Sequence, residues 1–226
     1  MNALSKILAF LVGIGFAASV WMIFFYAPVE AKMGFIQKIF YFHVPVAWLM
    51  FLSVIVCALF SLVFLVNKNE KIDVIAHSAG ELSVVFGCIV LTTGPIWGHK
   101  AWNAWWVWDV RLTSTLILEL IFVAYVLVRE YAGTVGRLLS SGLAVFGAIN
   151  VPLIYFSVDL WRGTHPPRLI AKGQMDAQML QTFLICMLTF TVFWFLLMIN
   201  RVSSGNLLLQ LEDLKLSFLQ KRRKTR

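Results

Sequence analysis

The sequence predicts an all-α integral membrane protein, with six transmembrane helices in one bundle. Hydrophobic residues make up 60% of the 226 residues, charged residues only 13%, and the mean hydropathy is +0.83. A water-soluble domain does not carry this composition on its surface. Six apolar runs are long enough to cross about 30 Å of hydrocarbon as helices that rise about 1.5 Å per residue.

The six apolar runs follow one another with only brief connections. The first is preceded by Lys6 and could be taken for a signal peptide, but it continues to Phe25 without a clear cleavage site, so we expect a retained helix. The third and fourth runs are short, and both end at a tryptophan-rich segment. Residues 1–205 are therefore expected to form one transmembrane domain, whose predicted helices cover residues 7–25, 44–66, 82–97, 113–128, 138–156 and 179–199.

Residues 206–226 are expected to form a cytoplasmic tail that is amphipathic and basic. Leu207, Leu211, Leu214 and Phe218 would share one face of a helix, and the basic residues 221–224 follow. This pattern suits a helix that lies on an anionic leaflet, or one that docks a cytosolic partner.

The charges between the helices leave the orientation nearly balanced. Without the distal tail, six cations lie on the side of the termini and seven on the other side. The basic tail favours cytoplasmic termini by the positive-inside rule. Cations kept on the outer side would then serve an anionic ligand or partner. They are Lys32, Lys38, Lys100, Arg111, Arg162, Arg168 and Lys172.

The tryptophan-rich segment is the most unusual part of the chain. Five of the nine tryptophans fall within residues 97–108, and Asp109 and Arg111 follow at once. Trp102, Trp105, Trp106 and Asp109 have the spacing of one helical stripe, which predicts a short interfacial helix carrying the motif. Indole faces could stack on a flat aromatic ligand, whereas the alternative is an aromatic belt at the lipid headgroups. Asp109 also suits the N-cap of the next helix.

Two histidines would reach the same outer side from distant segments. His43 opens the second helix just before Pro45, and His165 lies in the loop between the fifth and sixth helices. Two neutral imidazoles from separate segments are what six-coordinate haem iron takes as axial ligands, although either ring alone could be a hydrogen-bonded interfacial side chain. His99 is taken as a loop residue and a less favoured alternative ligand, and His77 is expected to be solvated on the opposite side.

One carboxylate and three cysteines lie inside the apolar runs. Glu119 is an intramembrane carboxylate, for which we favour a helix contact within the bundle over a polar contact below a ligand pocket. Cys57, Cys88 and Cys186 are isolated and are expected to be small buried hydrophobes. The chain has no Cys-x-x-Cys-His motif, so haem would not be attached to it as in a c-type cytochrome.

The segment from Trp102 to Ser114 reads W-x-x-W-W-x-W-D-x-R-L-T-S and is bracketed by His43 and His165. In this it resembles the haem-handling family of cytochrome c maturation proteins. The chain length and six spans resemble the CcmC type of the system I pathway rather than the longer CcmF and CcsA types. The resemblance covers nearly the whole chain. It implies a bacterial inner-membrane protein whose termini are cytoplasmic and whose tryptophan motif is periplasmic.

The resemblance also implies a cargo, a site and partners. The cargo would be haem b, with its iron between His43 and His165. Delivery would be to the membrane-anchored haem chaperone CcmE, within an ATP-driven complex with CcmA, CcmB and CcmD. We expect a carrier and no enzyme, because the cofactor supplies its own chemistry. The platform for haem would be formed by Trp97, Trp102, Trp105, Trp106, Trp108 and Asp109, and Arg111 is a candidate to bind a haem propionate.

Two other classes of protein fit parts of the pattern. A transporter for an organic cation could use the tryptophans as an aromatic cage, with Asp109 or Glu119 as the nearby acid and no need for histidine. A structural membrane subunit would use the tryptophans only as an interfacial anchor and would bind no ligand.

Overall fold

The computed structural model describes residues 3–161, 163–165, 173 and 175–224. Within these residues, six helical segments are long and apolar enough to cross a membrane, which confirms the predicted six-span, all-α architecture. In chain order the elements are α1 (Ala3–Trp21), η1 (Met22–Tyr26), η2 (Phe35–Ile39), α2 (Phe40–Asn67), α3 (Glu70–Trp102), α4 (Val110–Tyr131), η3 (Gly133–Val135), α5 (Gly136–Ala148), α6 (Asn150–Leu160) and α7 (Ala177–Lys224).

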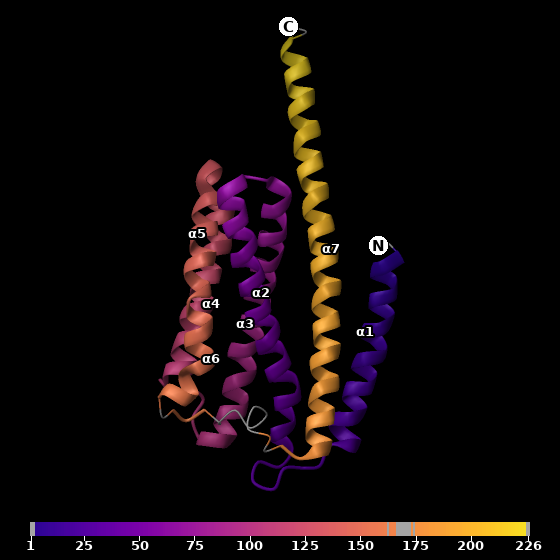
Figure 1. Cartoon of the computed structure of the whole chain (residues 1–226), viewed down its shortest axis with the longest axis vertical. Coiled ribbons are helices and arrows are strands. Elements are labelled where there is room, and N and C mark those ends of the chain that lie inside the picture. The colour runs from indigo at the N-terminus through magenta and orange to yellow at the C-terminus, as the bar shows by residue number, and fades with distance from the viewer. Residues whose placement is uncertain (1–2, 162, 166–172, 174, 225–226) are drawn as a thin grey trace.

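The helices run roughly parallel to one long axis, and the two chain termini lie toward the same end (Figure 1). We call this the terminal end. The segments before α2 and before α4, together with residues 163–165, lie at the opposite end, which we call the loop end. The fifth span is made of α5 and α6, which are separated at Ile149. Pro152 explains the interruption, because its ring displaces the carbonyl four residues earlier and it has no amide hydrogen to donate.

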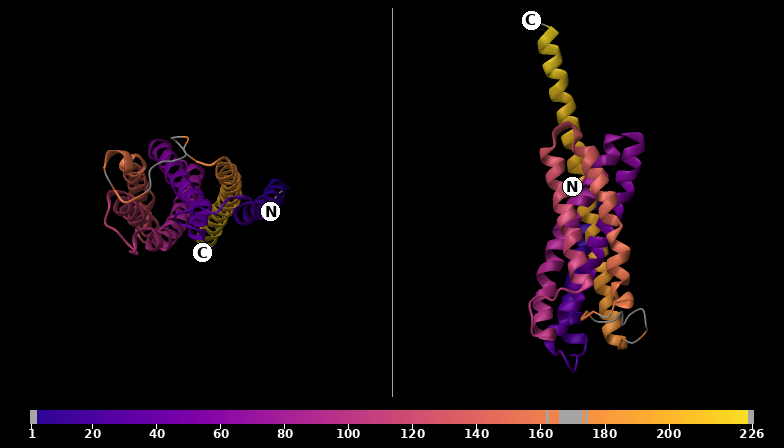
Figure 2. Two further views of the ribbon diagram at one scale, coloured as in Figure 1. Left: turned by 90° about the horizontal axis from the view of Figure 1, so that it is seen from below. Right: turned by 90° about the vertical axis from the view of Figure 1, so that its left-hand side faces the viewer.

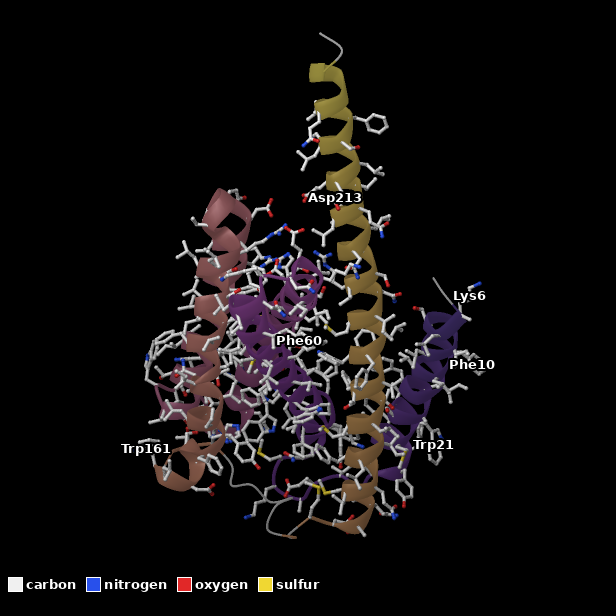
Figure 3. The ribbon with its side chains drawn as sticks, turned by 45° about the horizontal axis from the view of Figure 1, so that its top comes forward. Lys6, Phe10, Trp21, Phe60, Trp161 and Asp213 are labelled. Atoms are coloured by element: carbon white, nitrogen blue, oxygen red, sulfur yellow. The ribbon has the colours of Figure 1, made fainter. Side chains whose placement is uncertain are left out.

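Helix α1 lies at one edge of the molecule, beside α7 (Figure 2). Its approach to α7 depends on Gly15, where an added Cβ would lie only 2.7 Å from Thr189 Oγ1. Small residues let membrane helices pack this closely. Phe10 and Trp21 point outward from α1 (Figure 3) and are 69% and 57% exposed. These side chains are therefore placed to face lipid.

The core of the bundle is formed by α2, α3, α4, α5, α6 and α7. Leu49, Val54 and Phe122 are almost completely buried there. Trp194 of α7 adds a polar link, because its indole Nε1 donates to Ser53 Oγ of α2 at 2.7 Å. In lipid, where the hydrophobic effect between helices is weak, such close packing and interhelical hydrogen bonds hold the bundle together.

Helix α3 is longer than the apolar run that predicted it, because charged residues near its start are paired inside the bundle. Asp73 is only 1% exposed and receives two hydrogen bonds from the guanidinium of Arg129 in α4, one of them at 2.8 Å. Glu81 receives two from Arg201 of α7, at 2.5 and 2.7 Å. His77 Nε2 lies 3.4 Å from Glu81 Oε1 and its Nδ1 is buried, so the expectation of a solvated His77 was wrong.

Helix α7 continues well beyond the other helices at the terminal end (Figure 1). It runs without a break across residue 205, where Gly205 lies against Val74 of α3. Beyond that contact, the predicted amphipathic face is helical and each of its members is more than half exposed. The face consists of Leu207, Leu211, Leu214 and Phe218, and its contact with a leaflet or a partner stays a prediction.

The Asp73–Arg129 pair makes a testable contribution to stability. We expect Arg129→Ala to lower the free energy of unfolding by roughly 3–5 kcal/mol, because it leaves a buried carboxylate without its main partner. Arg137→Ala is the matched control, since Arg137 bonds mainly to the exposed Glu70 and should cost about 1 kcal/mol or less. Denaturant unfolding in detergent micelles measures both. Equal losses for the two variants would contradict the prediction.

Candidate functional site

His43 lies in the first turn of α2 and faces α3. Its Nδ1 is 2.7 Å from the hydroxyl Oγ1 of Thr93. The next residue along α3 is Gly94, and a Cβ placed there would lie 3.4 Å from His43 Cε1, at van der Waals contact. The imidazole is therefore held against α3 by one polar contact and by the backbone of a residue without a side chain.

His165 lies at the loop end and contacts Arg111 in the first turn of α4. Its Nδ1 is 3.2 Å from Arg111 Nη1. An arginine side chain only donates, so His165 Nδ1 is the acceptor in this hydrogen bond. Arg111 is itself fixed, because Nε donates to the Ile154 carbonyl at 3.2 Å and Nη2 donates to the Tyr155 carbonyl at 2.9 Å. Helix α6 thus positions Arg111, and Arg111 positions His165.

Asp109 joins the tryptophan segment to the segment that carries His165. Its Oδ1 accepts from the Leu112 amide at 2.8 Å, which confirms the predicted N-cap of α4. Its Oδ2 accepts from the Thr164 hydroxyl at 2.9 Å. Gly163 lies against the same carboxylate, where an added Cβ would be 3.4 Å from Oδ2. One carboxylate therefore both starts α4 and holds residues 163–165.

The two predicted ligand histidines are brought to the same end of the bundle, although 121 positions separate them in the sequence. Sequence reasoning missed their neighbours Thr93 and Thr164. The only sequence feature that could have indicated Thr93 is that it is polar and lies within an apolar run. For Thr164 it is only its position next to His165.

The expectation of a short interfacial helix for the tryptophan motif was wrong. Helix α3 continues as far as Trp102, and Asn103 then ends it in the left-handed conformation with φ of 54°. Asparagine is one of the few residues that adopt this conformation readily, and it commonly ends helices. The chain stays non-helical until Val110 opens α4. The motif therefore spans one helix end and one connection, and its tryptophans do not share a helical stripe.

The indoles of the motif form separate ring contacts. Trp97 and Trp102 meet edge to face with centroids 5.5 Å apart, and Trp97 Nε1 donates to Gln37 Oε1 at 3.3 Å. Trp106 and Trp108 also meet edge to face, at 5.6 Å. Trp105 and Trp108 are 60% and 75% exposed. Trp106 Nε1 is buried and has no hydrogen-bond partner among the described residues.

His99 is helical, where a loop residue was expected. It lies in the last turn of α3, and its ring stacks on Trp105 with centroids 4.2 Å apart. Near the same segment, an open hollow of about 310 Å³ borders the start of α4 and includes a single tryptophan. Its lining residues are Trp108, Asp109, Val110, Thr113, Ser114 and Ile117.

The expected outer cations have different surroundings. Lys38 is 8% exposed, and its ammonium group donates to the carbonyls of Ile23 and Ala27 at the end of η1. Positive charge is favourable at a helix C-terminus, so Lys38 has a structural role there. Lys100 is exposed at the end of α3. The predictions for Arg162, Arg168 and Lys172 lie outside the described residues.

The intramembrane polar residues behave mainly as helix contacts. Glu119 is 5% exposed, accepts a hydrogen bond from Cys88 Sγ at 3.3 Å, and occupies space that Gly87 of α3 leaves free. This is the helix contact that the sequence favoured. Cys57 and Cys186 are buried as expected, whereas Cys88 is exposed, so the prediction was wrong for that residue.

Comparison with known proteins relates the whole arrangement to one family. Residues 1–216 match the family described as CcmC, Heme exporter protein C. Heme exporter protein C of Bradyrhizobium diazoefficiens is 34% identical over 171 residues, which are 74% of this chain and 65% of that protein.

Two further relatives carry the same description. Heme exporter protein C of Escherichia coli is 31% identical over 201 residues, which cover 84% of this chain and 77% of the relative. Heme exporter protein C of Rhodobacter capsulatus is 32% identical over 145 residues, covering 63% and 60% of the two proteins. With a family match over nearly all of its residues, this six-span chain belongs to the Heme exporter protein C (CcmC) family.

Proposed function

We propose that this protein holds haem b as cargo at the loop end of its bundle, with the iron between His43 and His165, and passes it on for the assembly of c-type cytochromes. The observation that carries this proposal is the convergence of two histidines from distant segments, each with a hydrogen-bond partner on Nδ1. Histidines that ligate metals commonly donate the N–H of their other ring nitrogen to a partner, which fixes the ring, and His43 can donate in this way to Thr93. His165 instead accepts from Arg111, so this bond would have to be released before His165 ligated through Nε2. Membership of a family named for haem export supplies the choice of cargo.

The tryptophan segment could contact both the flat face of a porphyrin and the propionates at its edge. Trp105 and Trp108 offer the most exposed indole surface, on which a flat macrocycle can stack. The buried N–H of Trp106 lacks an acceptor among the described residues, and a propionate oxygen is an acceptor of the required kind. Trp97 and Trp102 contact each other edge to face at the end of α3, just before this surface in the sequence.

Asp109 and Arg111 belong to the proposed site mainly as positioning residues. Asp109 accepts from Thr164, and Arg111 contacts His165 itself. Together they hold the segment of the second ligand beside the tryptophans. Arg111 is already bonded to two backbone carbonyls, so its guanidinium is better suited to fixing this segment than to following a mobile propionate.

The proposed setting is the bacterial inner membrane, with cytoplasmic termini and the loop end in the periplasm. The basic end of α7 supports this orientation. Haem held beside exposed indoles would be accessible to the chaperone CcmE, and CcmA, CcmB and CcmD would complete an ATP-driven complex. The protein would act as a carrier rather than an enzyme, with any bond-making to haem left to the chaperone.

An aromatic cage for an organic cation is less well supported by the ring geometry. A cage needs several aromatic faces directed at one point within about 6 Å. Here Trp105 stacks on His99, and the other four motif indoles meet in two edge-to-face pairs. The hollow beside Asp109 is open and is bordered by one tryptophan only.

The axial ligands can be tested by spectroscopy of the purified protein. With haem bound and reduced, we expect the sharp Soret and α bands of bis-histidine iron, and we expect His43→Ala and His165→Ala each to abolish this low-spin spectrum. His77→Ala is the control, because His77 lies toward the terminal end and contacts Glu81. A protein that stays colourless after haem addition would contradict the proposal. Loss of the spectrum in His99→Ala but not in His165→Ala would reassign the second ligand.

The proposed orientation can be tested by labelling in intact cells. The native cysteines Cys57, Cys88 and Cys186 are first replaced by serine, and single cysteines are then placed at exposed positions as Lys100→Cys or Ser217→Cys. A membrane-impermeant maleimide should label the first variant in whole cells and the second only after lysis. The reverse pattern would place the loop end in the cytoplasm and overturn this part of the proposal.

A further inference from the structure

The Thr93 hydroxyl contacts two groups at once. Its Oγ1 lies 2.8 Å from the Ile89 carbonyl oxygen, one turn earlier in α3, and 2.7 Å from His43 Nδ1. A hydroxyl carries one proton but can also accept hydrogen bonds. A carbonyl oxygen can only accept. The proton of Thr93 is therefore directed at the backbone of its own helix, as is common for threonine inside helices.

This arrangement determines the state of the His43 ring. With the Thr93 proton given to Ile89, Oγ1 accepts from His43, and this arrangement favours the tautomer with its hydrogen on Nδ1. A neutral imidazole has one N–H and one lone pair, so the lone pair is on Nε2. Neutral imidazole nitrogen is the form that binds a metal. The ring is thus prepared to ligate through Nε2 and through no other atom.

The ring is also restrained in space. Nδ1 is fixed by Thr93, and Cε1 lies at contact distance from the position that a Gly94 side chain would occupy. Thr93 is one helical turn further from the loop end than Trp97 of the same helix. The hydrogen bond therefore reaches His43 from the interior side of the tryptophan segment, and Nε2 lies on the opposite edge of the ring.

We infer that Thr93 is a positioning residue for the proposed haem site, which holds His43 in the Nδ1–H tautomer and directs Nε2 at the iron. The inference rests on the proposed function. Thr93 acts on iron only through His43, by orienting the ring and by raising the basicity of Nε2 through the hydrogen bond to Nδ1–H.

The chain provides a closely matched control in the neighbouring residue. Thr92 makes the same kind of bond, from its hydroxyl to the Cys88 carbonyl at 2.7 Å, but its side chain is exposed. Thr93→Val and Thr92→Val each remove one hydroxyl-to-backbone bond and keep the shape of the side chain. Any difference between them reports on the contact with His43. Thr93→Ser keeps the hydroxyl and serves as the conservative rescue.

The experiment compares these variants of the full chain in detergent, titrated with haem. We expect Thr93→Val to weaken haem binding by about 10–100-fold, the usual effect of losing a hydrogen-bond partner of a metal ligand. Thr92→Val and Thr93→Ser should bind haem as the parent does. The midpoint potential of bound haem should rise in Thr93→Val alone, because a less basic ligand stabilises ferric iron less. A merely structural role for Thr93 would not move this potential selectively.

The outcomes separate the inference from the proposal beneath it. If His43→Ala loses the low-spin spectrum while Thr93→Val and Thr92→Val match in affinity and potential, the positioning role of Thr93 is overturned and the haem site stands. If His43→Ala leaves the spectrum unchanged, the proposed function itself fails. If Thr93→Val does not accumulate in the membrane, Thr93→Ala is compared with Thr92→Ala instead. Haem affinity and midpoint potential then decide whether Thr93 positions His43.

Discussion

The site depends on a constraint that the membrane imposes on the backbone. In hydrocarbon, each peptide N–H and C=O must be bonded within the protein, so spanning segments are helical and irregular backbone is confined to places buried in protein, near water or at the interface. Residues 103–109 and 163–165 are irregular and lie at the loop end. Asp109 links them, because it satisfies the first turn of α4 with one oxygen and Thr164 with the other. The carboxylate that begins α4 thus also joins two segments of the candidate site.

The membrane spans were predictable because apolar side chains are the ones that can face lipid. The start of α3 is an exception, and hydropathy did not predict it. Residues 70–81 of α3 are polar on average, yet Asp73 and Glu81 are paired with Arg129 and Arg201 of other helices. Pairing between segments so distant in sequence leaves no local pattern. The N-cap at Asp109 was predictable for the opposite reason, since its partner, the Leu112 amide, is only three residues away.

In the candidate site, too, features that depend on nearby residues were predictable, and contacts between distant segments were not. His43 and His165 could be selected by residue type and by the side of the membrane that each would reach. Their partners Thr93 and Arg111 could not, because both contacts join separate helices or loops. The helical spacing of the tryptophans led to a wrong prediction of a short helix. Spacing alone does not show that Asn103 adopts a left-handed conformation and ends α3. The sequence therefore indicated candidate residues, but not the contacts that hold them in place.

The contact between Arg111 and His165 has a consequence for how the proposed site would bind and release haem. A guanidinium on Nδ1 holds the lone pair of His165 toward α4, so a neutral ring in this state has its proton on Nε2 and cannot offer that atom to a metal. For His165 to coordinate iron, its hydrogen bond to Arg111 would have to break or its ring would have to rotate. His43 would need no such change. In the proposed haem site, the ligand on α2 would therefore be held ready, whereas the ligand beside α4 would first have to lose a hydrogen bond, and this asymmetry would suit a carrier that releases its cargo.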